Sequence, residues 1–316
     1  MRYLAFKLVL ALLLLSVTPQ LCVTPATAGE RLDRTAREVL APHKAIYNIE
    51  MISRRSSSQI LNIHGQMYFS LLPSCEAWST DHRFNLYYEY SDSAPMQITS
   101  DFTTYETLDG QSFDFSSRRK RDGELYQELR GSVARNQNGQ GVVTYSQPVG
   151  LSFEMPAGSL FPMAHTAAMM KNIRTGQKIF SAVVFDGSDE EGPIEINTVV
   201  GKAVNVMATL QPGPAIDTTL INSPARRARM AFFPLASTGP EADYEMDVIL
   251  HDNGVISDMT VDYGEFSVSQ KLVALENIAG PACDDKTPAK LENPGKPDKS
   301  EPPQENPKRK MFRLIP

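Results

Sequence analysis

The residues in this sequence that could do chemistry begin with its three cysteines, Cys22, Cys75 and Cys283. Cys22 lies in a segment typical of a cleaved leader, so the processed chain would keep two, an even number. In an oxidising compartment we expect Cys75 and Cys283 to form a disulfide, although they are 208 residues apart (283 − 75 = 208). The alternative is a redox-active pair, which usually has the C-x-x-C spacing that these positions lack.

The five histidines stand in no spacing that is typical of a metal site. H-E-x-x-H is absent, and so is the G-x-S-x-G turn of serine hydrolases. His43 follows a proline at an expected strand entry, where its ring can hydrogen-bond a nearby carbonyl, and His165 lies on the stripe of an expected helix. We interpret all five as structural, and we predict no metal, no cofactor and no catalytic residue. They are His43, His64, His82, His165 and His251.

Two clusters of charged side chains could bind ions or charged groups. Arg118, Arg119 and Arg121 precede an Asp-Gly turn and could contact phosphates of lipid headgroups or anionic glycans. The alternative is an exposed loop that its charge keeps soluble. The acidic turn from Asp186 to Glu191 offers oxygens that could hold Ca²⁺. It lacks the alternation of a calcium loop, so a solvated hairpin tip is the other interpretation.

The first 28 residues predict the compartment to which the protein is exported. Arg2 and Lys7 precede a short apolar run, and Ala26-Thr27-Ala28 is typical of a signal-peptide cleavage site. A lipid anchor on Cys22 is an alternative, but the residues before Cys22 are not the small ones that such processing favours. No later stretch is long and apolar enough to span a membrane, so we expect a soluble protein exported to the periplasm.

The charge of the chain excludes one broad class of partner. The net charge is −6, and it becomes −8 (−6 − 2 = −8) when Arg2 and Lys7 leave with the signal peptide. An acidic protein of this kind is a poor general binder of nucleic acid.

The elements that must position the candidate residues are mostly strands. Alternation of apolar and polar residues is the dominant pattern, as in the segments around Phe84–Tyr90 and Tyr244–Leu250. Asp-Gly and Asn-Gly pairs separate these runs and favour tight hairpins. We therefore predict an all-β, mainly antiparallel domain with about a dozen to fourteen strands.

Two helices interrupt this pattern. A short one is predicted over Glu30–Leu40, and a second over Phe161–Ile173, with Phe161, His165 and Met169 on its apolar stripe. Four methionines crowd this second helix. Flexible methionines suit an adaptable cavity that could hold an acyl chain, and they equally fill ordinary cores. These four are Met155, Met163, Met169 and Met170.

The composition divides the chain into three parts. After the signal peptide, residues 29–283 show no shift in composition, which predicts one β domain. Residues 284–316 are rich in Pro, Lys and Glu and predict a disordered tail. The last six residues are more apolar and could be a docking peptide or a frayed end.

A set of short motifs in fixed order resembles one known family. The motifs span about Leu40 to Cys283, are weak one by one, and are fairly specific together. The chain is similar to the EipB family of periplasmic cell-envelope-integrity proteins, long described as a domain of unknown function. The matching residues are Leu40-Ala41-Pro42-His43, Ala45, Tyr47, Cys75, Trp78, Pro156-Ala157-Gly158, Leu160-Phe161-Pro162, His165, Val184-Phe185-Asp186-Gly187-Ser188, Gly201, Asp252-Asn253-Gly254-Val255, Asp262-Tyr263-Gly264-Glu265-Phe266 and Cys283.

The resemblance implies an incomplete, spirally wound β-barrel of about fourteen strands, with a disulfide that ties a strand to the C-terminal segment. It also implies a role in envelope maintenance, no established catalysis, and a functional link to a tetratricopeptide-repeat protein. The charged tail and Met230-Ala231-Phe232-Phe233, where we would expect a Trp-containing strand, depart from the family pattern.

Our leading hypothesis is therefore a non-enzymatic periplasmic protein that supports envelope integrity through contacts with other envelope proteins. The alternatives are a carrier of lipid or lipoprotein and a hydrolase of envelope polymers. Besides the predicted disulfide, the candidate contact residues are Trp78, His43, Phe161, His165, Met169, Arg118, Arg119 and Arg121.

Overall fold

The computed structural model describes residues 39–210, 212–235 and 239–280 of the chain. Four of the sequence predictions fall wholly or mostly outside these residues. They are the signal peptide of residues 1–28, the short helix over Glu30–Leu40, the pairing partner Cys283 and the tail of residues 284–316.

Within these described residues, fourteen strands form one sheet in the order β8-β7-β6-β5-β4-β3-β2-β1-β14-β13-β12-β11-β10-β9, and the strand neighbours pair antiparallel. The strands are β1 His43–Arg54, β2 Ile60–Pro73, β3 Ala77–Tyr90, β4 Met96–Thr107, β5 Ser112–Arg121, β6 Glu124–Arg135, β7 Gly141–Gln147, β8 Ser152–Met155, β9 Ile179–Val184, β10 Ile194–Val204, β11 Ala225–Pro234, β12 Tyr244–His251, β13 Ile256–Asp262 and β14 Phe266–Asn277.

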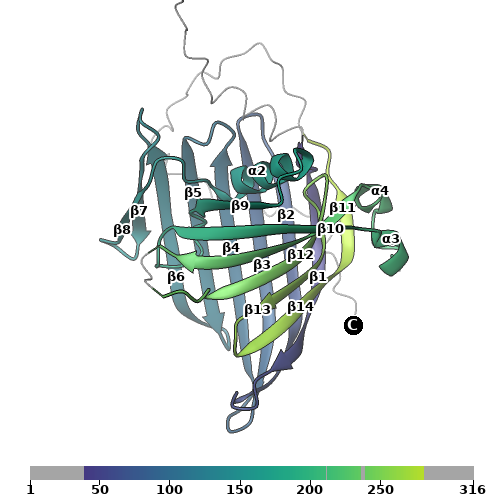
Figure 1. The fold of residues 1–316 in the computed structure, drawn as a ribbon. Coiled ribbons are helices and arrows are strands. Elements are labelled where there is room, and N and C mark those ends of the chain that lie inside the picture. Colours follow the sequence, from purple (N-terminus) through teal and green to yellow (C-terminus); the bar gives the residue numbers. More distant parts are fainter. Residues whose placement is uncertain (1–38, 211, 236–238, 281–316) are drawn as a thin grey trace, which may run out of the picture. The chain divides into compact units, whose positions relative to one another are not determined.

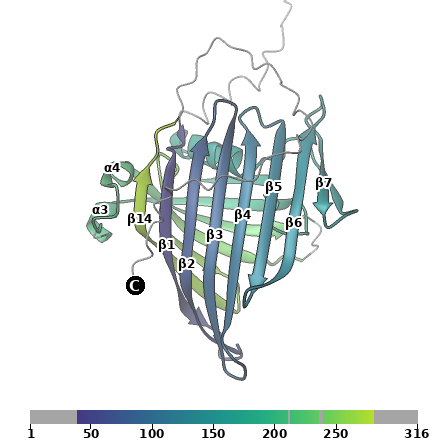
Figure 2. The same ribbon diagram turned by 180° about the vertical axis from the view of Figure 1, so that it is seen from behind.

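The sheet consists of two meanders that meet at one long-range pairing. Strands β1 to β8 follow one another in sequence, as do β9 to β14, and β1 pairs with β14. Figures 1 and 2 show that the second meander curls back across the first, so that inner faces of the two oppose each other. The edge strands β8 and β9 do not pair, and the barrel is therefore incomplete, as the resemblance implied.

The hairpins form where the sequence predicts them. Asp122-Gly123 connects β5 to β6 and Asn253-Gly254 connects β12 to β13. Asp122 and Gly123 both have positive φ, at 50° and 86°, which is the conformation that tight hairpin turns need.

The second predicted helix is present as α2, Pro162–Arg174. Pro162 occupies the first turn, and Gly176, at φ 80°, follows the last one. Its buried residues include the predicted His165 and Met169. Two four-residue helices, α3 Val206–Thr209 and α4 Thr218–Ile221, were not predicted, because segments so short carry no helical period.

The acidic turn between β9 and β10 closes part of the gap between the two meanders. Arg119 of β5 donates to the Ser188 carbonyl at 2.7 Å, and the Tyr145 hydroxyl of β7 donates to the Asp189 carbonyl at 2.7 Å. The buried Gly187 lies against the ring of Phe115. The tip of the turn is solvated at the exposed Glu190 and Glu191, as in the hairpin-tip interpretation, while strands distant in sequence partly cover the rest.

The interior is apolar and rich in methionine. The largest group of buried side chains draws on both meanders and on α2, and it includes Met67, Met169, Met170, Met230 and Met259. No helix among the described residues is both long and apolar enough to cross a membrane.

Candidate functional site

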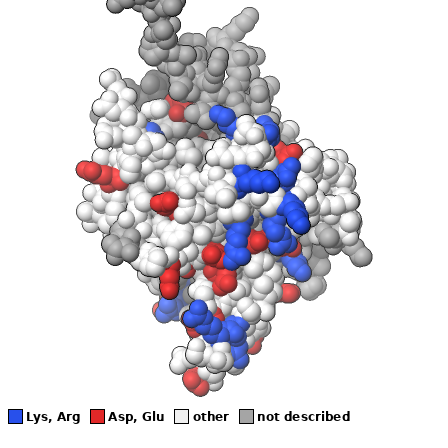
Figure 3. Space-filling model, viewed as in Figure 1, with Lys and Arg blue, Asp and Glu red and all other residues white. Residues whose placement is uncertain are grey.

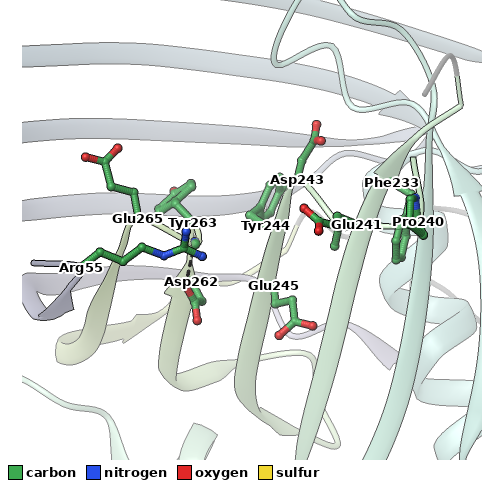
Figure 4. Close-up of a pocket in the computed structure, with 12 residues that line it drawn as sticks. Arg55, Phe233, Pro240, Glu241, Asp243, Tyr244, Glu245, Asp262, Tyr263 and Glu265 are labelled. Atoms are coloured by element: carbon green, nitrogen blue, oxygen red, sulfur yellow. Dashed lines mark hydrogen bonds between the residues drawn. The ribbon is translucent and has the colours of Figure 1, made fainter. Parts of the chain in front are cut away.

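An open groove of about 590 Å³ lies at the ends of strands β11 to β14 (Figure 4). The end of β11, the approach to β12, the β13–β14 turn and the residue that follows β1 all contribute to it. The groove thus gathers four separate parts of the sequence at one rim of the sheet. It is lined by Arg55, Phe233, Pro240, Glu241, Ala242, Asp243, Tyr244, Glu245, Asp262, Tyr263, Gly264 and Glu265.

Aromatic rings form a continuous row along this rim. The ring of Tyr244 stacks on Phe232 with centroids 4.2 Å apart and lies 5.9 Å from Tyr263, which lies 5.0 Å from Phe266. Burial raises the pKa of Tyr244, so its hydroxyl stays protonated. Tyr263 is 46% exposed and presents its ring to the groove.

Carboxylates outnumber cations in the groove. Glu245 and Asp262 lie directly opposite each other on β12 and β13, an arrangement of like charges that destabilises a sheet. Arg229 pairs with Glu245, and the backbone N–H of Gly264 donates to Asp262 at 2.8 Å. Within the described part of the chain, no ion pair involves Glu241, Asp243, Asp262 or Glu265.

One cation, Arg55, lies among the groove residues. Its backbone N–H donates to the Glu265 carbonyl at 2.8 Å and so ties the β1–β2 turn to the β13–β14 turn. Its side chain extends toward Asp262 and Tyr263 (Figure 4). The groove therefore combines an aromatic floor, an acidic rim and a single positive group.

A second cluster of buried charged groups fixes helix α2. The Glu106 carboxylate of β4 accepts hydrogen bonds from the backbone N–H groups of Met163 and Ala164, both at 2.7 Å. These are amides at the N-terminus of α2, which no residue of the helix can satisfy. Burial raises the pKa of Glu106 to about 7, while the two N–H groups and the nearby Arg135 oppose that rise.

Arg135 of β6 completes this anchor. It donates to the carbonyls of Gly110, Gly139 and Ser159, and its guanidinium lies 4.7 Å from the centre of the Phe161 ring. The residues before α2 are thereby held to two hairpin turns of the first meander. This cluster is satisfied by the protein itself, and we interpret it as structural.

Five of the sequence-predicted contact residues lie in the interior near α2 or in the strands beside it. The Nδ1–H of His43 donates to the Ala41 carbonyl at 2.7 Å, as expected, and burial lowers the pKa of His43. Trp78 packs with Leu71 in a cluster that also contacts Met163. Phe161 stacks on Phe113 at 4.9 Å.

His165 and Met169 are buried on α2. Among the residues that the structure describes, the imidazole Nε2 of His165 and the indole N–H of Trp78 find no hydrogen-bond partner. Burial lowers the pKa of His165 to about 4, so it is neutral near pH 7. All five side chains are buried, which argues against direct contact with a partner protein in this conformation, and their role as ligand contacts in the interior stays a prediction.

The three predicted arginines do not form one patch. Arg118 pairs with Glu128 at 3.7 Å, Arg119 binds the acidic turn, and Arg121 lies 5.2 Å from the centre of the Tyr126 ring. Alternation along β5 sends Arg118 and Arg119 to opposite faces of the sheet, and a register shift between Arg119 and Lys120 interrupts the alternation before Arg121.

The structure also bears on the possible calcium site in the acidic turn and on the predicted disulfide. Among the described residues no group of three or more His, Cys, Asp and Glu side chains could hold a metal ion. In the acidic turn, Asp186 and Asp189 instead accept backbone N–H groups of Ser188 and Glu191. Cys75 is disulfide-bonded, and its pairing with Cys283 stays a prediction because Cys283 lies outside the described residues.

The groove is the feature that the sequence analysis missed. One signal was present, since Asp262-Tyr263-Gly264-Glu265-Phe266 was among the motifs of the resemblance, but we assigned it no role. The alternation of acid and aromatic residues recurs at Asp243-Tyr244-Glu245. Nothing in the sequence shows that these two segments lie side by side.

Known proteins with a similar sequence and fold identify the family. The chain is 29% identical over 244 residues, 75% of its own length and 84% of the relative's, to "Cell envelope integrity protein EipB" of Brucella abortus (strain 2308). It is also similar to the crystal structure of a β-barrel-like protein of a domain of unknown function from Brucella abortus. That match has a TM-score of 0.67 and 28% identity, and it covers 76% of this chain and 99% of the other. The model of the family described as EipB-like matches residues 34–279, and the chain belongs to this family.

Proposed function

We propose that this protein helps to maintain the integrity of the cell envelope, as an exported, non-catalytic protein of the periplasm that acts through contacts with other envelope proteins. The observation that carries the proposal is the groove at the ends of β11 to β14, with its exposed aromatic ring and its four exposed carboxylates that form no ion pair within the described residues. The printed name of the Brucella relative, a cell envelope integrity protein, supports the same role.

The physical character of the groove favours a contact surface for a macromolecule. It is open and lies on a rim of the sheet, and four of its carboxylates are exposed. Aromatic rings are enriched in protein interfaces because they bury a large area at little cost in side-chain entropy. The two segments that carry these rings are held by paired strands, which keeps the surface preorganised.

The direct test is deletion of the gene in its own host, followed by exposure to a detergent, a chelator and a cell-wall antibiotic. We expect the deletion strain to lose viability more readily than the parent, and the wild-type gene to restore it. A deletion strain as resistant as its parent would contradict the proposed role.

The non-catalytic part of the proposal has its own test. Purified protein is incubated with peptidoglycan fragments and with anionic lipids, and the products are compared with those of a heat-treated sample. We expect no turnover above this background. Specific cleavage that scales with protein concentration would replace our proposal with the hydrolase alternative.

The interior supports a second candidate, a carrier of lipid or of a lipoprotein acyl chain. Met67, Met169, Met230 and Met259 are buried between the two meanders, and methionine adapts its shape to apolar ligands. Native mass spectrometry of protein purified from envelope extracts distinguishes the candidates. A reproducibly bound lipid would favour the carrier, and its absence the contact surface.

A further inference from the structure

We infer that the groove binds an extended segment of a partner polypeptide that carries lysine or arginine side chains. This inference rests on the proposed function, since it names the chemistry of the partner at the same groove. The proposed partner is a basic polypeptide, and binding of small cations in its place is one outcome of the test.

The lining of the groove carries an excess of negative charge. Glu241, Asp243, Asp262 and Glu265 are exposed and form no ion pair within the described residues, although the charge of Arg229, the partner of Glu245, also acts on Asp262. Asp262 lies directly opposite Glu245, and the one positive charge of Arg229 acts on both of these negative charges. Departures from a local rule of this kind are concentrated at functional sites. A bound lysine or arginine would relieve the repulsion.

The rest of the same sheet shows that this excess charge is local. On the outer face of β11 and β12, Arg227 pairs with Asp247 at 3.1 Å and Arg229 pairs with Glu245. Figure 3 accordingly shows blue and red side chains interspersed on the face that it presents. Arg227 and Arg229 on these strands are thus paired, whereas four carboxylates of the groove form no ion pair within the described residues.

Aromatic rings line the same groove and add a second basis for binding a basic side chain. Tyr263 is 46% exposed, and its ring contacts Tyr244 and Phe266, which hold it in place. The face of a tyrosine attracts an ammonium or guanidinium group, and the aliphatic stem of lysine or arginine packs on the same ring. Carboxylates and an aromatic face together select a basic side chain over a bare metal ion.

The length of the groove and its lining arginine, Arg55, suit an extended polypeptide. A groove of about 590 Å³ that extends from β11 to the β13–β14 turn is longer than one side chain requires. Arg55 extends toward Asp262 and Tyr263 and can donate to carbonyl or carboxylate oxygens of a bound chain (Figure 4). An extended polypeptide offers both partners, basic side chains for the rim and carbonyls for Arg55.

The test uses the purified protein and a capped peptide of alternating lysine and alanine, followed by isothermal titration calorimetry. The groove variant carries Glu241→Gln, Asp243→Asn, Asp262→Asn and Glu265→Gln, which retain shape and remove charge. The control variant removes the same charge from four exposed carboxylates outside the groove lining, through Glu50→Gln, Asp114→Asn, Glu154→Gln and Glu276→Gln.

We expect the wild type and the control variant to bind the lysine peptide, and the groove variant to bind it at least about tenfold more weakly. Affinity should fall as salt is added, and a glutamate–alanine peptide should not bind. Equal losses in the two variants would overturn the inference, because they would show a general charge effect. Spermine that binds as tightly as the peptide would also overturn it.

The failure of this inference is distinguishable from failure of the proposed function. If the peptide does not bind but the deletion strain still loses envelope integrity, the partner chemistry is wrong and the function stands. If the deletion strain is unaffected, the proposed function is wrong whatever the calorimetry shows. Circular dichroism of both variants, expected to match the wild type, confirms that the comparison concerns folded protein.

Discussion

Glu106 shows how a single buried carboxylate can couple this fold to pH. It is 3% exposed, and its oxygens accept two amides at the N-terminus of α2. Burial raises its pKa from 4.5 to about 7. At pH values between these two, the folded state therefore keeps a proton on Glu106 that the unfolded state has lost. The free energy of unfolding that this group contributes therefore decreases as pH rises from about 4.5 to 7, by up to about 3 kcal/mol.

We predict that Glu106→Gln removes this dependence. The stability of the wild type relative to the variant should be greater at pH 5 than at pH 7.5, as measured by urea denaturation. The comparison must be relative, because the lowered pKa of His165 acts in the opposite direction in both proteins. Met163→Ala, which weakens the same helix end without removing a titratable group, is the control. A difference that stays constant over this pH range would contradict the assignment.

Tyr263 is the residue at which the aromatic argument can be tested separately from charge. Replacing it with leucine, in Tyr263→Leu, keeps apolar area and removes the π face. An exposed cation–π contact contributes about 0.5–1 kcal/mol, so we predict about two- to fivefold weaker binding of the lysine peptide. Calorimetry at constant salt measures the change. Tyr105→Leu, on an exposed tyrosine outside the groove lining, is the control, and an equal loss there would refute the specific role.

At the scale of elements, the β9–β10 turn connects the two meanders through its hydrogen bonds to β5 and β7. Gly187 has φ 71°, and a Cβ at this position would lie 2.5 Å from the Phe115 ring. We predict that Gly187→Ala lowers the free energy of unfolding by about 2–4 kcal/mol, through backbone strain and this clash together. The measurement is urea denaturation combined with limited proteolysis of the turn.

Gly123→Ala is the matched control for this substitution. Gly123 has a similar positive φ of 86°, but no atom lies within 4 Å of its virtual Cβ. It therefore reports the backbone strain alone, and the difference between the two variants reports the contact with Phe115. Equal losses would show that the turn does not depend on that contact.

The sequence predicted individual elements better than their contacts. Hairpins at Asp122-Gly123 and Asn253-Gly254 were predictable because the positive φ requirement is local. Helix α2 was predictable from its period and from Pro162 and Gly176. The environment of the acidic turn was not, because β5 and β7 lie far from it in sequence. The groove was missed for the same reason, since its residues come from four separate segments.

At the scale of the whole molecule, the fold depends on joining distant parts of the chain. Pairing of β1 with β14 unites the meanders, and no local pattern in the sequence indicates it. The incomplete barrel was expected from the family resemblance rather than from periodicity. The long loop that this pairing closes costs conformational entropy, which a covalent link would reduce.

The predicted disulfide provides that link and its own test. We predict that Cys75→Ser and Cys283→Ser each lower the melting temperature by several degrees, and that the double variant adds little more. The chain-entropy estimate for a loop of 208 residues (283 − 75 = 208) is about 5 kcal/mol, as an upper value. Melting curves with and without reductant measure the effect. Identical curves for the wild type under the two conditions would contradict the prediction.

The central claim is that this protein supports the envelope through the groove at the ends of β11 to β14. Its most direct test is survival of the deletion strain under detergent when it carries the four-residue groove variant or the charge-matched control, at equal protein levels. Our account predicts that the control restores the survival of the wild type and that the groove variant does not. Full restoration by the groove variant would contradict it.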